Sequence, residues 1–178
     1  MLNLSLSKFK SQHLKEKNQI VYYSIKTEGQ KEIDNLINNF LIEKDSFIFE
    51  SVEKGFIKGR YTIFGKNPDK IWEFNNNSCK LFYKNQTKIL KGSPKNNIEK
   101  IIEDFNFNIP KGLPSISSIL SGYFSYDIIR YIEKIPNKTK NDLNIPDSRI
   151  LRPRNVIIHD NFDKKIYFIV NIFKDEKI

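Results

Sequence analysis

The sequence is poor in cysteine and glycine, and it lacks long apolar runs. Its 178 residues include one cysteine, Cys79, which excludes an intrachain disulfide scaffold. No apolar run approaches the roughly 18–20 residues that a membrane-spanning helix needs. The start of the chain is too polar, and its apolar part too short, for a secretory signal. We therefore expect a cytoplasmic protein with no membrane partner.

Familiar catalytic motifs are missing as well. The 7 glycines form neither a dinucleotide-binding Gly-x-Gly-x-x-Gly pattern nor a phosphate-binding Walker loop, and the chain has no nucleophile elbow and no Cys-x-x-Cys pair. The two histidines, His13 and His159, lie far apart in sequence, and neither has the spacing of a metal ligand. The residues alone therefore assign no catalytic group and no metal site.

Lysine and arginine outnumber the acidic residues by 30 to 21, which gives a formal net charge of +9. A basic balance can indicate nucleic-acid binding. However, the chain has no alanine and is rich in Lys, Asn, Ile and Phe, a bias that A/T-rich codons produce without any selection for binding. Because lysines scattered singly usually form a solvated surface, we expect no nucleic-acid partner. A basic module that binds RNA or an acidic protein stays as an alternative.

The hydrophobic pattern predicts a mixed fold. Residues 1–18 are expected to form an N-terminal arm or a short edge strand, and strands are predicted near 20–25, 47–53, 60–64, 71–74, 80–83, 87–90, 119–125, 155–159 and 165–173. Helical spacing of apolar residues predicts helices over 33–41, 97–105 and 126–135. A turn is expected at 65–69 and a surface connection over 137–154. This order indicates an α+β domain over residues 19–173, an antiparallel sheet meander with two to three flanking helices.

Two segments contain candidate functional residues, and the first surrounds Glu50. In a strand over 47–53, Glu50 would share a face with Ile48 and Val52. Burying a carboxylate among apolar neighbours is costly without a partner. Glu50 is therefore either solvated at a sheet edge or paired with a cation such as an ammonium group, with the Ser51 hydroxyl beside it.

The second segment runs from Leu120 to Glu133. Its residues Asp127, Arg130 and Glu133 are three apart, so on a helix they would stack as an acid–base–acid ladder. Tyr126 and neighbouring aromatic side chains supply a large contact area. The ladder is either a set of weak surface ion pairs or a docking surface toward another domain, and the residues leave both open.

Together these segments resemble anthranilate synthase component I, in the N-terminal domain that precedes its chorismate-binding catalytic domain. The matching stretches follow the family order: Phe49–Glu53, Gly59–Gly65 with Asn67-Pro68, Ser121–Pro136, Asp142–Asp147 and Asn155–Tyr167. The family usually has leucines before Glu-Ser, whereas this chain has Ile48 and Phe49. The resemblance implies that the predicted sheet and helices are part of the fold of that family.

The resemblance also implies a function. The complete family enzyme converts chorismate and ammonia to anthranilate and pyruvate, the first committed step toward tryptophan. A glutamine amidotransferase subunit, component II, supplies the ammonia, and Mg²⁺ is needed at the chorismate site. The family's N-terminal domain carries part of the feedback site for L-tryptophan. By position, Phe49, Glu50 and Ser51 would line that pocket, with added charge from Lys58 or Arg60.

The same resemblance bears on the rest of the chain. Tyr126, Asp127, Arg130 and Glu133 are expected to form a domain interface. The catalytic domain is expected to lie beyond Ile178, so we expect a fragment that holds no cofactor and is inactive alone. Related enzymes of the chorismate group, aminodeoxychorismate (p-aminobenzoate) synthase component I and salicylate or isochorismate synthase, are alternatives. The run from Glu50 to Glu53 favours the anthranilate branch.

Overall fold

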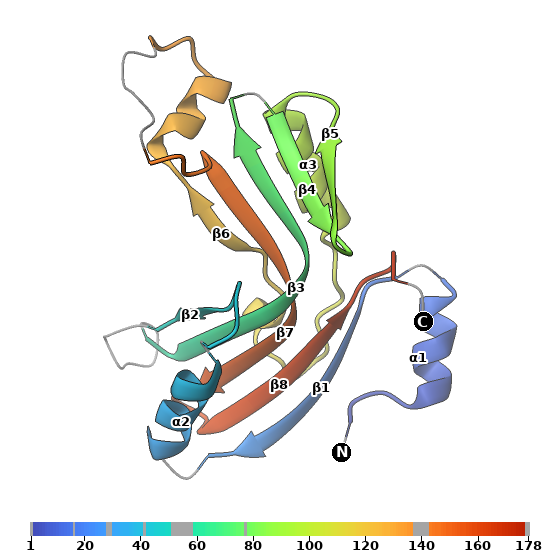
Figure 1. The fold of residues 1–178 in the computed structure, drawn as a ribbon. Helices are drawn as coiled ribbons and strands as arrows, with labels where there is room; N and C mark the ends of the chain where they lie inside the picture. Colours follow the sequence, from blue (N-terminus) through green and yellow to red (C-terminus); the bar gives the residue numbers. More distant parts are fainter. Residues whose placement is uncertain are drawn as a thin grey trace. The chain divides into compact units, whose positions relative to one another are not determined.

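The computed structural model describes residues 2–15, 17–27, 30–40, 42–50, 59–76, 78–136 and 143–176. Its helices and strands are, in chain order, α1 (Leu6–His13), β1 (Gln19–Lys26), α2 (Gln30–Phe40), β2 (Phe47–Phe49), β3 (Tyr61–Asn75), β4 (Ser78–Tyr83), β5 (Gln86–Leu90), α3 (Pro94–Asp104), the 3-10 helix η1 (Ser115–Ser117), β6 (Ser121–Phe124), the 3-10 helix η2 (Tyr126–Tyr131), β7 (Ser148–Asp160) and β8 (Lys165–Ile172) (Figure 1). None of the described helices has the length and apolar character needed to cross a membrane.

The strands form one hydrogen-bonded sheet with the order β1-β8-β7-β3-β4-β5, while β2 pairs with β3 and β6 pairs with β7. The pairs β1–β8, β7–β8, β2–β3, β3–β4, β4–β5 and β6–β7 are antiparallel. The predicted α+β class with an antiparallel sheet is thus confirmed. The chain divides into two compact units: unit 1 holds residues 1–68, 107–119 and 153–178, and unit 2 holds residues 69–106 and 120–152.

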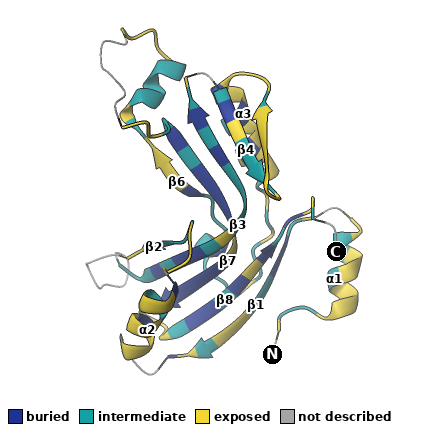
Figure 2. Ribbon diagram, in the orientation of Figure 1, coloured by how far each residue is buried: buried dark blue, intermediate teal, exposed yellow. Residues whose placement is uncertain are grey.

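Unit 1 has apolar side chains on both faces of its strands. Along β7, Val156 and Ile158 belong to one cluster and Ile157 to the other, as the twofold repeat of a strand requires. Helix α2 covers the second cluster with side chains at helical spacing, namely Ile33, Leu36, Ile37 and Phe40. The first cluster is covered by the segment that includes Phe107, Ile109, Leu113 and Ile116. Because both faces are covered, residues 156–160 of β7 are all buried (Figure 2).

Unit 2 packs one sheet face against α3. Ser93 caps this helix by accepting a hydrogen bond from the Asn96 N–H, and Pro94 stands in the first turn, where its missing N–H costs nothing. These two residues start the helix three positions before the predicted Asn97. Its Ile101 packs with Trp72, Phe74, Cys79 and Ile150. Cys79 is fully buried in this core, and its burial raises the pKa of the thiol to about 11.

Three local predictions and one of two alternatives were wrong. Of the arm and the edge strand expected over residues 1–18, the edge strand is not found, because residues 6–13 form helix α1. The expected turn at 65–69 lies within the continuous strand β3, where Asn67 adopts a positive φ of 52° and Pro68 offers no N–H, features typical of a bulge. Strand β7 begins at Ser148, inside the expected surface connection, because β6 pairs with its first residues. The predicted helix over 126–135 is a 3-10 helix that ends at Tyr131.

Candidate functional site

The first candidate site lies where β2 ends beside the beginning of β3. The antiparallel register places Phe47 opposite Gly65 and Phe49 opposite Ile63. Glu50 follows the last residue of β2 and Arg60 precedes the first residue of β3, so both flank the same end of this antiparallel strand pair. Ser51 and Lys58, the other polar members, lie outside the described residues.

The predicted alternation of side chains along β2 is seen in the structure. Ile48 packs into the cluster under α2, while the rings of Phe47 and Phe49 lie 5.1 Å apart. The Phe47 ring covers Gly65 so closely that a Cβ at Gly65 would meet ring atoms at 2.1 Å. Phe49 is 48% exposed, and Glu50 is exposed just past the strand end. The exposed Glu50 carboxylate can pair with an ammonium group, and the exposed Phe49 ring can stack on an aromatic group.

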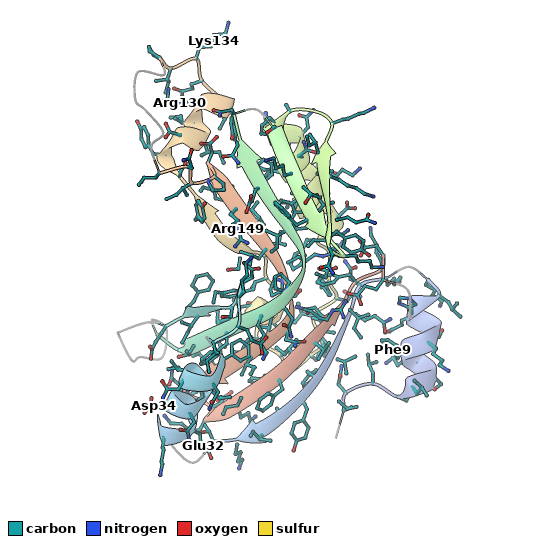
Figure 3. The ribbon with its side chains drawn as sticks, viewed as in Figure 1. Phe9, Glu32, Asp34, Arg130, Lys134 and Arg149 are labelled. Carbon is teal, nitrogen blue, oxygen red and sulfur yellow. The ribbon has the colours of Figure 1, made fainter. Side chains whose placement is uncertain are left out.

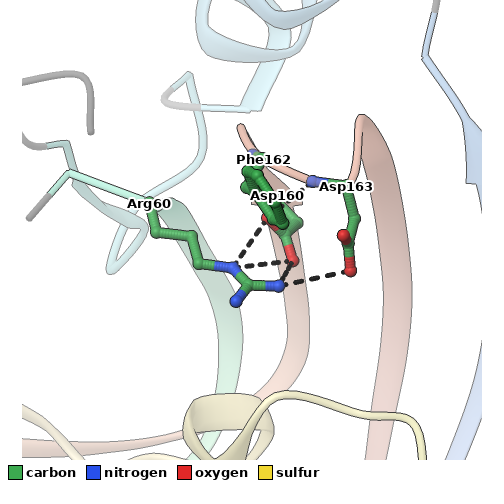
Figure 4. A network of polar contacts seen from close by, with 4 residues as sticks. All are labelled: Arg60, Asp160, Phe162 and Asp163. Carbon is green, nitrogen blue, oxygen red and sulfur yellow. Dashed lines mark hydrogen bonds and ion pairs between the residues drawn. The ribbon is translucent and has the colours of Figure 1, made fainter. Parts of the chain in front are cut away.

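Arg60 is held by an acidic turn (Figure 4). Its Nε donates to Asp160 Oδ1 at 3.0 Å, and its Nη2 donates to Asp160 Oδ2 at 2.7 Å and to Asp163 Oδ2 at 3.2 Å. The guanidinium also lies over the rings of Tyr61 and Phe162, at 5.0 and 5.3 Å from their centroids. This bidentate pairing ties the first residues of β3 to the turn between β7 and β8. Arg60 therefore acts here as a structural cation.

Asp160 is almost completely buried, with a side chain that is 1% exposed. Burial by itself raises the pKa of this carboxyl, but the hydrogen bonds from Arg60 and from the backbone N–H groups of Asp163 and Phe162 outweigh it and lower the pKa below its usual value. The folded protein thus holds Asp160 as a carboxylate. Asn161 completes the contact, because its N–H donates to the Arg60 carbonyl at 2.8 Å and its side chain to the Gly59 carbonyl at 3.2 Å.

The lowered pKa of Asp160 predicts acid sensitivity. A depressed carboxyl pKa contributes stability that is present above the unfolded pKa and is lost as the pH falls through the folded one. Urea unfolding should therefore show a lower midpoint for Asp160→Asn than for the native chain at pH 6, and a smaller difference at pH 3. Asp163→Asn, which removes a 41% exposed partner, is the matched control and should change the midpoint less. Equal effects at both pH values would contradict the assignment.

The second candidate segment lies in unit 2, on η2. A 3-10 helix has three residues per turn, so Asp127 and Arg130 are superposed, and Arg130 Nε donates to Asp127 Oδ1 at 2.8 Å. The third member of the predicted ladder, Glu133, is exposed and lies past the end of the helix. Arg130 Nη1 donates instead to the carbonyl oxygens of Ile135 and Pro136, at 3.2 and 2.8 Å. Figure 3 labels Arg130 on this segment.

Large apolar side chains are exposed on η2 and in the residues that flank it in sequence. Tyr126 is 83% exposed, and the other exposed side chains are Tyr123, Phe124, Ile132, Ile135, Leu143 and Ile145. The Tyr131 hydroxyl donates to Asp147 Oδ2 at 2.5 Å, and burial together with this hydrogen bond raises the pKa of Tyr131. Asp147 also accepts from the Asn76 N–H at 3.1 Å. These bonds anchor the aromatic segment to the β3–β4 turn.

Sequence reasoning missed the partners of both sites. In the sequence, Asp160 and Asp147 stand out only as members of the matching stretches Asn155–Tyr167 and Asp142–Asp147. A signal was present, because Asp160 begins a turn in which its carboxylate accepts from the N–H groups of Phe162 and Asp163, the hydrogen-bonding habit that makes Asp frequent in turns. That signal locates the turn, but it does not name Arg60 as its partner.

Comparisons with known proteins decide the family. The chain is 30% identical over 148 residues to "Anthranilate synthase component 1" of Cereibacter sphaeroides, an alignment that covers 80% of this chain and 30% of that protein. It is 33% identical over 140 residues to the protein of the same name from Acetivibrio thermocellus, covering 78% of this chain and 28% of that protein. The chain belongs to the anthranilate synthase component I family. It spans about 30% of the length of these curated relatives.

Two further comparisons define the extent of this relationship. A solved structure of anthranilate synthase component I from Streptococcus pneumoniae TIGR4 matches with a TM-score of 0.56, covering 80% of this chain and 30% of that chain at 19% sequence identity, so it shows the shared fold. No protein-family model matches the chain. In the part of our chain that the structure describes, no group of three or more His, Cys, Asp or Glu side chains could hold a metal ion.

Proposed function

We propose that this chain is the N-terminal regulatory part of an anthranilate synthase component I, and that the end of β2 with the start of β3 holds part of a feedback site for L-tryptophan. The family relationship supports the first statement. The position of Phe49 and Glu50 at one end of the β2–β3 pair supports the second, and it is the observation that carries the proposal. Ser51 and Lys58 belong to the proposed site by sequence position alone.

The chemistry of the described residues suits the polar end of an amino acid. Glu50 would accept hydrogen bonds from the ammonium group, and the exposed Phe49 ring would contact the indole. The Ser51 hydroxyl would bind the carboxylate end, and Lys58 would add charge. Arg60 contributes through its contact with Asp160 and Asp163, which holds the first residues of β3 in place.

The family relationship supports a proposal for the activity of the complete protein. We propose that the complete protein converts chorismate and ammonia to anthranilate and pyruvate in tryptophan biosynthesis, in the cytoplasm. Its partner would be a glutamine amidotransferase, component II, and Mg²⁺ would act at the chorismate site. We assign no catalytic step and no metal ligand to the residues of this chain. Tyr126, Asp127, Arg130 and Glu133 would face another domain of the enzyme, and the exposed aromatic surface near η2 supports this role.

Calorimetric titration with L-tryptophan tests the proposed site. Glu50→Gln should weaken tryptophan binding by about 10-fold or more, since a hydrogen bond to a charged group contributes about 1.5–3 kcal/mol. The same variant should leave binding of indole-3-propionate unchanged, because this analogue has no ammonium group. Ser51→Phe should abolish binding, whereas Ser24→Phe, at an exposed serine on β1, should have no effect. Native affinity in both Glu50→Gln and Ser51→Phe would refute the proposed site.

A further inference from the structure

Among the strands that the structure describes, β1 lies at the edge of the sheet and pairs with β8 alone. Backbone groups of an antiparallel edge strand point alternately toward the partner strand and away from it. The outward set includes Ile20 and Tyr22, because both bond to Asn3 on the side away from β8, and it continues to Ser24 and Lys26. Such a row of N–H and C=O groups is a template for pairing with another strand.

The side chain of Asn3 occupies part of this edge. Its Oδ1 accepts from the Tyr22 N–H at 2.8 Å, and its Nδ2 donates to the Ile20 carbonyl at 3.1 Å. The Asn3 N–H itself points to the Tyr22 carbonyl at 3.4 Å. A single residue thus reproduces the hydrogen bonds of a neighbouring strand over three residues of β1 and covers the template there.

The segment that places Asn3 is weakly attached. Helix α1 has no buried residue, and its apolar side chain Leu6 is 67% exposed, as is Leu14 just beyond it at 84%. Its backbone is tied to β1 by a bond from Gln19 Nε2 to the Phe9 carbonyl at 3.2 Å. Figure 1 shows α1 beside β1, and Figure 3 labels Phe9 on it. Because so little apolar area is buried, displacing residues 2–15 costs little free energy.

We propose that residues 2–15 are a displaceable cover of the β1 edge, and that the uncovered strand pairs antiparallel with β1 of a second copy of this chain. Pairing about Tyr22 is self-complementary, as a twofold interface requires. It sets Ile20 opposite Ser24 of the other copy, and the single charge of the strand, Lys26, opposite Asn18. No like charges face each other, and β1 has no proline to block the edge. This surface is independent of the proposed tryptophan site.

Sedimentation velocity over a range of concentrations tests the inference. Deleting residues 2–15 should lower the dimer dissociation constant at least tenfold relative to the full chain, and Asn3→Ala should shift it in the same direction. In the deletion background, Ser24→Pro should abolish dimerisation, since the proline removes an outward N–H, while Ser24→Ala should retain it. Unchanged association after the deletion would overturn the proposal.

Amide hydrogen exchange provides a second readout in case Ser24→Pro does not fold. In the deletion variant, exchange at Tyr22 and Ser24 should slow as the protein concentration rises, because these N–H groups become hydrogen-bonded across the dimer. Exchange at Val21 and Tyr23, which face β8, should not depend on concentration. Association without protection at Tyr22 and Ser24 would show that the copies meet through another surface and would refute pairing through β1.

Discussion

Replacing Gly122 with alanine is expected to destabilise unit 2 by about 3 kcal/mol, the upper end of the cost of overpacking. A Cβ at this position would lie 2.0 Å from the Arg149 carbonyl oxygen and 2.9 Å from the carbonyl carbon. The obstacle is backbone, so no side-chain rotation relieves it. Gly122 pairs with Ile150, and β6 would have to move away from β7 to make room. The Tyr126–Tyr131 helix follows directly on β6 and should lose order with it.

Urea unfolding followed by tryptophan fluorescence measures this effect, since the chain has 1 tryptophan and Trp72 lies in the core of unit 2. The matched control is Phe124→Ala on the same strand, where the side chain is 58% exposed. We expect the control to change the free energy of unfolding by less than about 1 kcal/mol, as surface substitutions usually do. Similar midpoints for Gly122→Ala and the native chain would mean that β6 does not approach β7 as closely as described.

Replacing Phe64 with alanine is expected to cost unit 1 about 3–5 kcal/mol, the range for large-to-small changes of an aromatic core residue. Phe64 is 0% exposed and makes an edge-to-face contact with Phe40 of α2 at 5.6 Å between ring centroids. Its removal leaves a cavity between β3 and α2. Because the total stability of a domain is only about 5–15 kcal/mol, this single change should remove a large part of it.

Thermal and urea unfolding by circular dichroism measure the loss. Phe49→Ala is the matched control, since Phe49 lies on the paired strand β2 opposite Ile63 and is 48% exposed. We expect Phe49→Ala to change the free energy of unfolding by less than about 1 kcal/mol and to weaken tryptophan binding. Comparing the two variants therefore distinguishes a residue needed for core packing, Phe64, from one proposed to contact the ligand, Phe49. A Phe64→Ala variant of nearly native stability would contradict the packing of α2 on β3.

Much of the fold could be predicted where the determining residues are close in sequence. The spacing of Ile33, Leu36, Ile37 and Phe40 predicted α2, and the polar turn at Lys84-Asn85, both at positive φ, separates β4 from β5 where a turn was expected. Less could be predicted of β7. The run Arg152-Pro153-Arg154 reads as a surface connection, yet Arg152 is buried in an ion pair with Asp69, and Pro153 is buried inside a strand whose first residues pair with β6.

For the candidate site, the residues around Glu50 and the family relationship were accessible from motifs alone. The family is confirmed, while the binding roles of Phe49, Glu50, Ser51, Lys58 and Arg60 and the interface role of the η2 residues stay predictions. Arg60 shows where sequence reasoning stops. Its charge made it a candidate ligand contact, whereas the structure engages that charge with Asp160, a residue 100 positions away.

Local pattern was enough to predict the α+β class, α2 and most of the strands, because alternation and helical spacing depend on neighbours within a turn or two of the chain. The family came from the resemblance of its motifs. Tertiary structure alone assigned the partners: Asp160 to Arg60, Asp147 to Tyr131, Asn3 to the edge of β1, and β6 to the first residues of β7. Each of these pairs joins groups that are far apart in sequence and that satisfy each other's hydrogen bonds away from water. Neighbouring residues in the sequence do not determine which distant group becomes the partner.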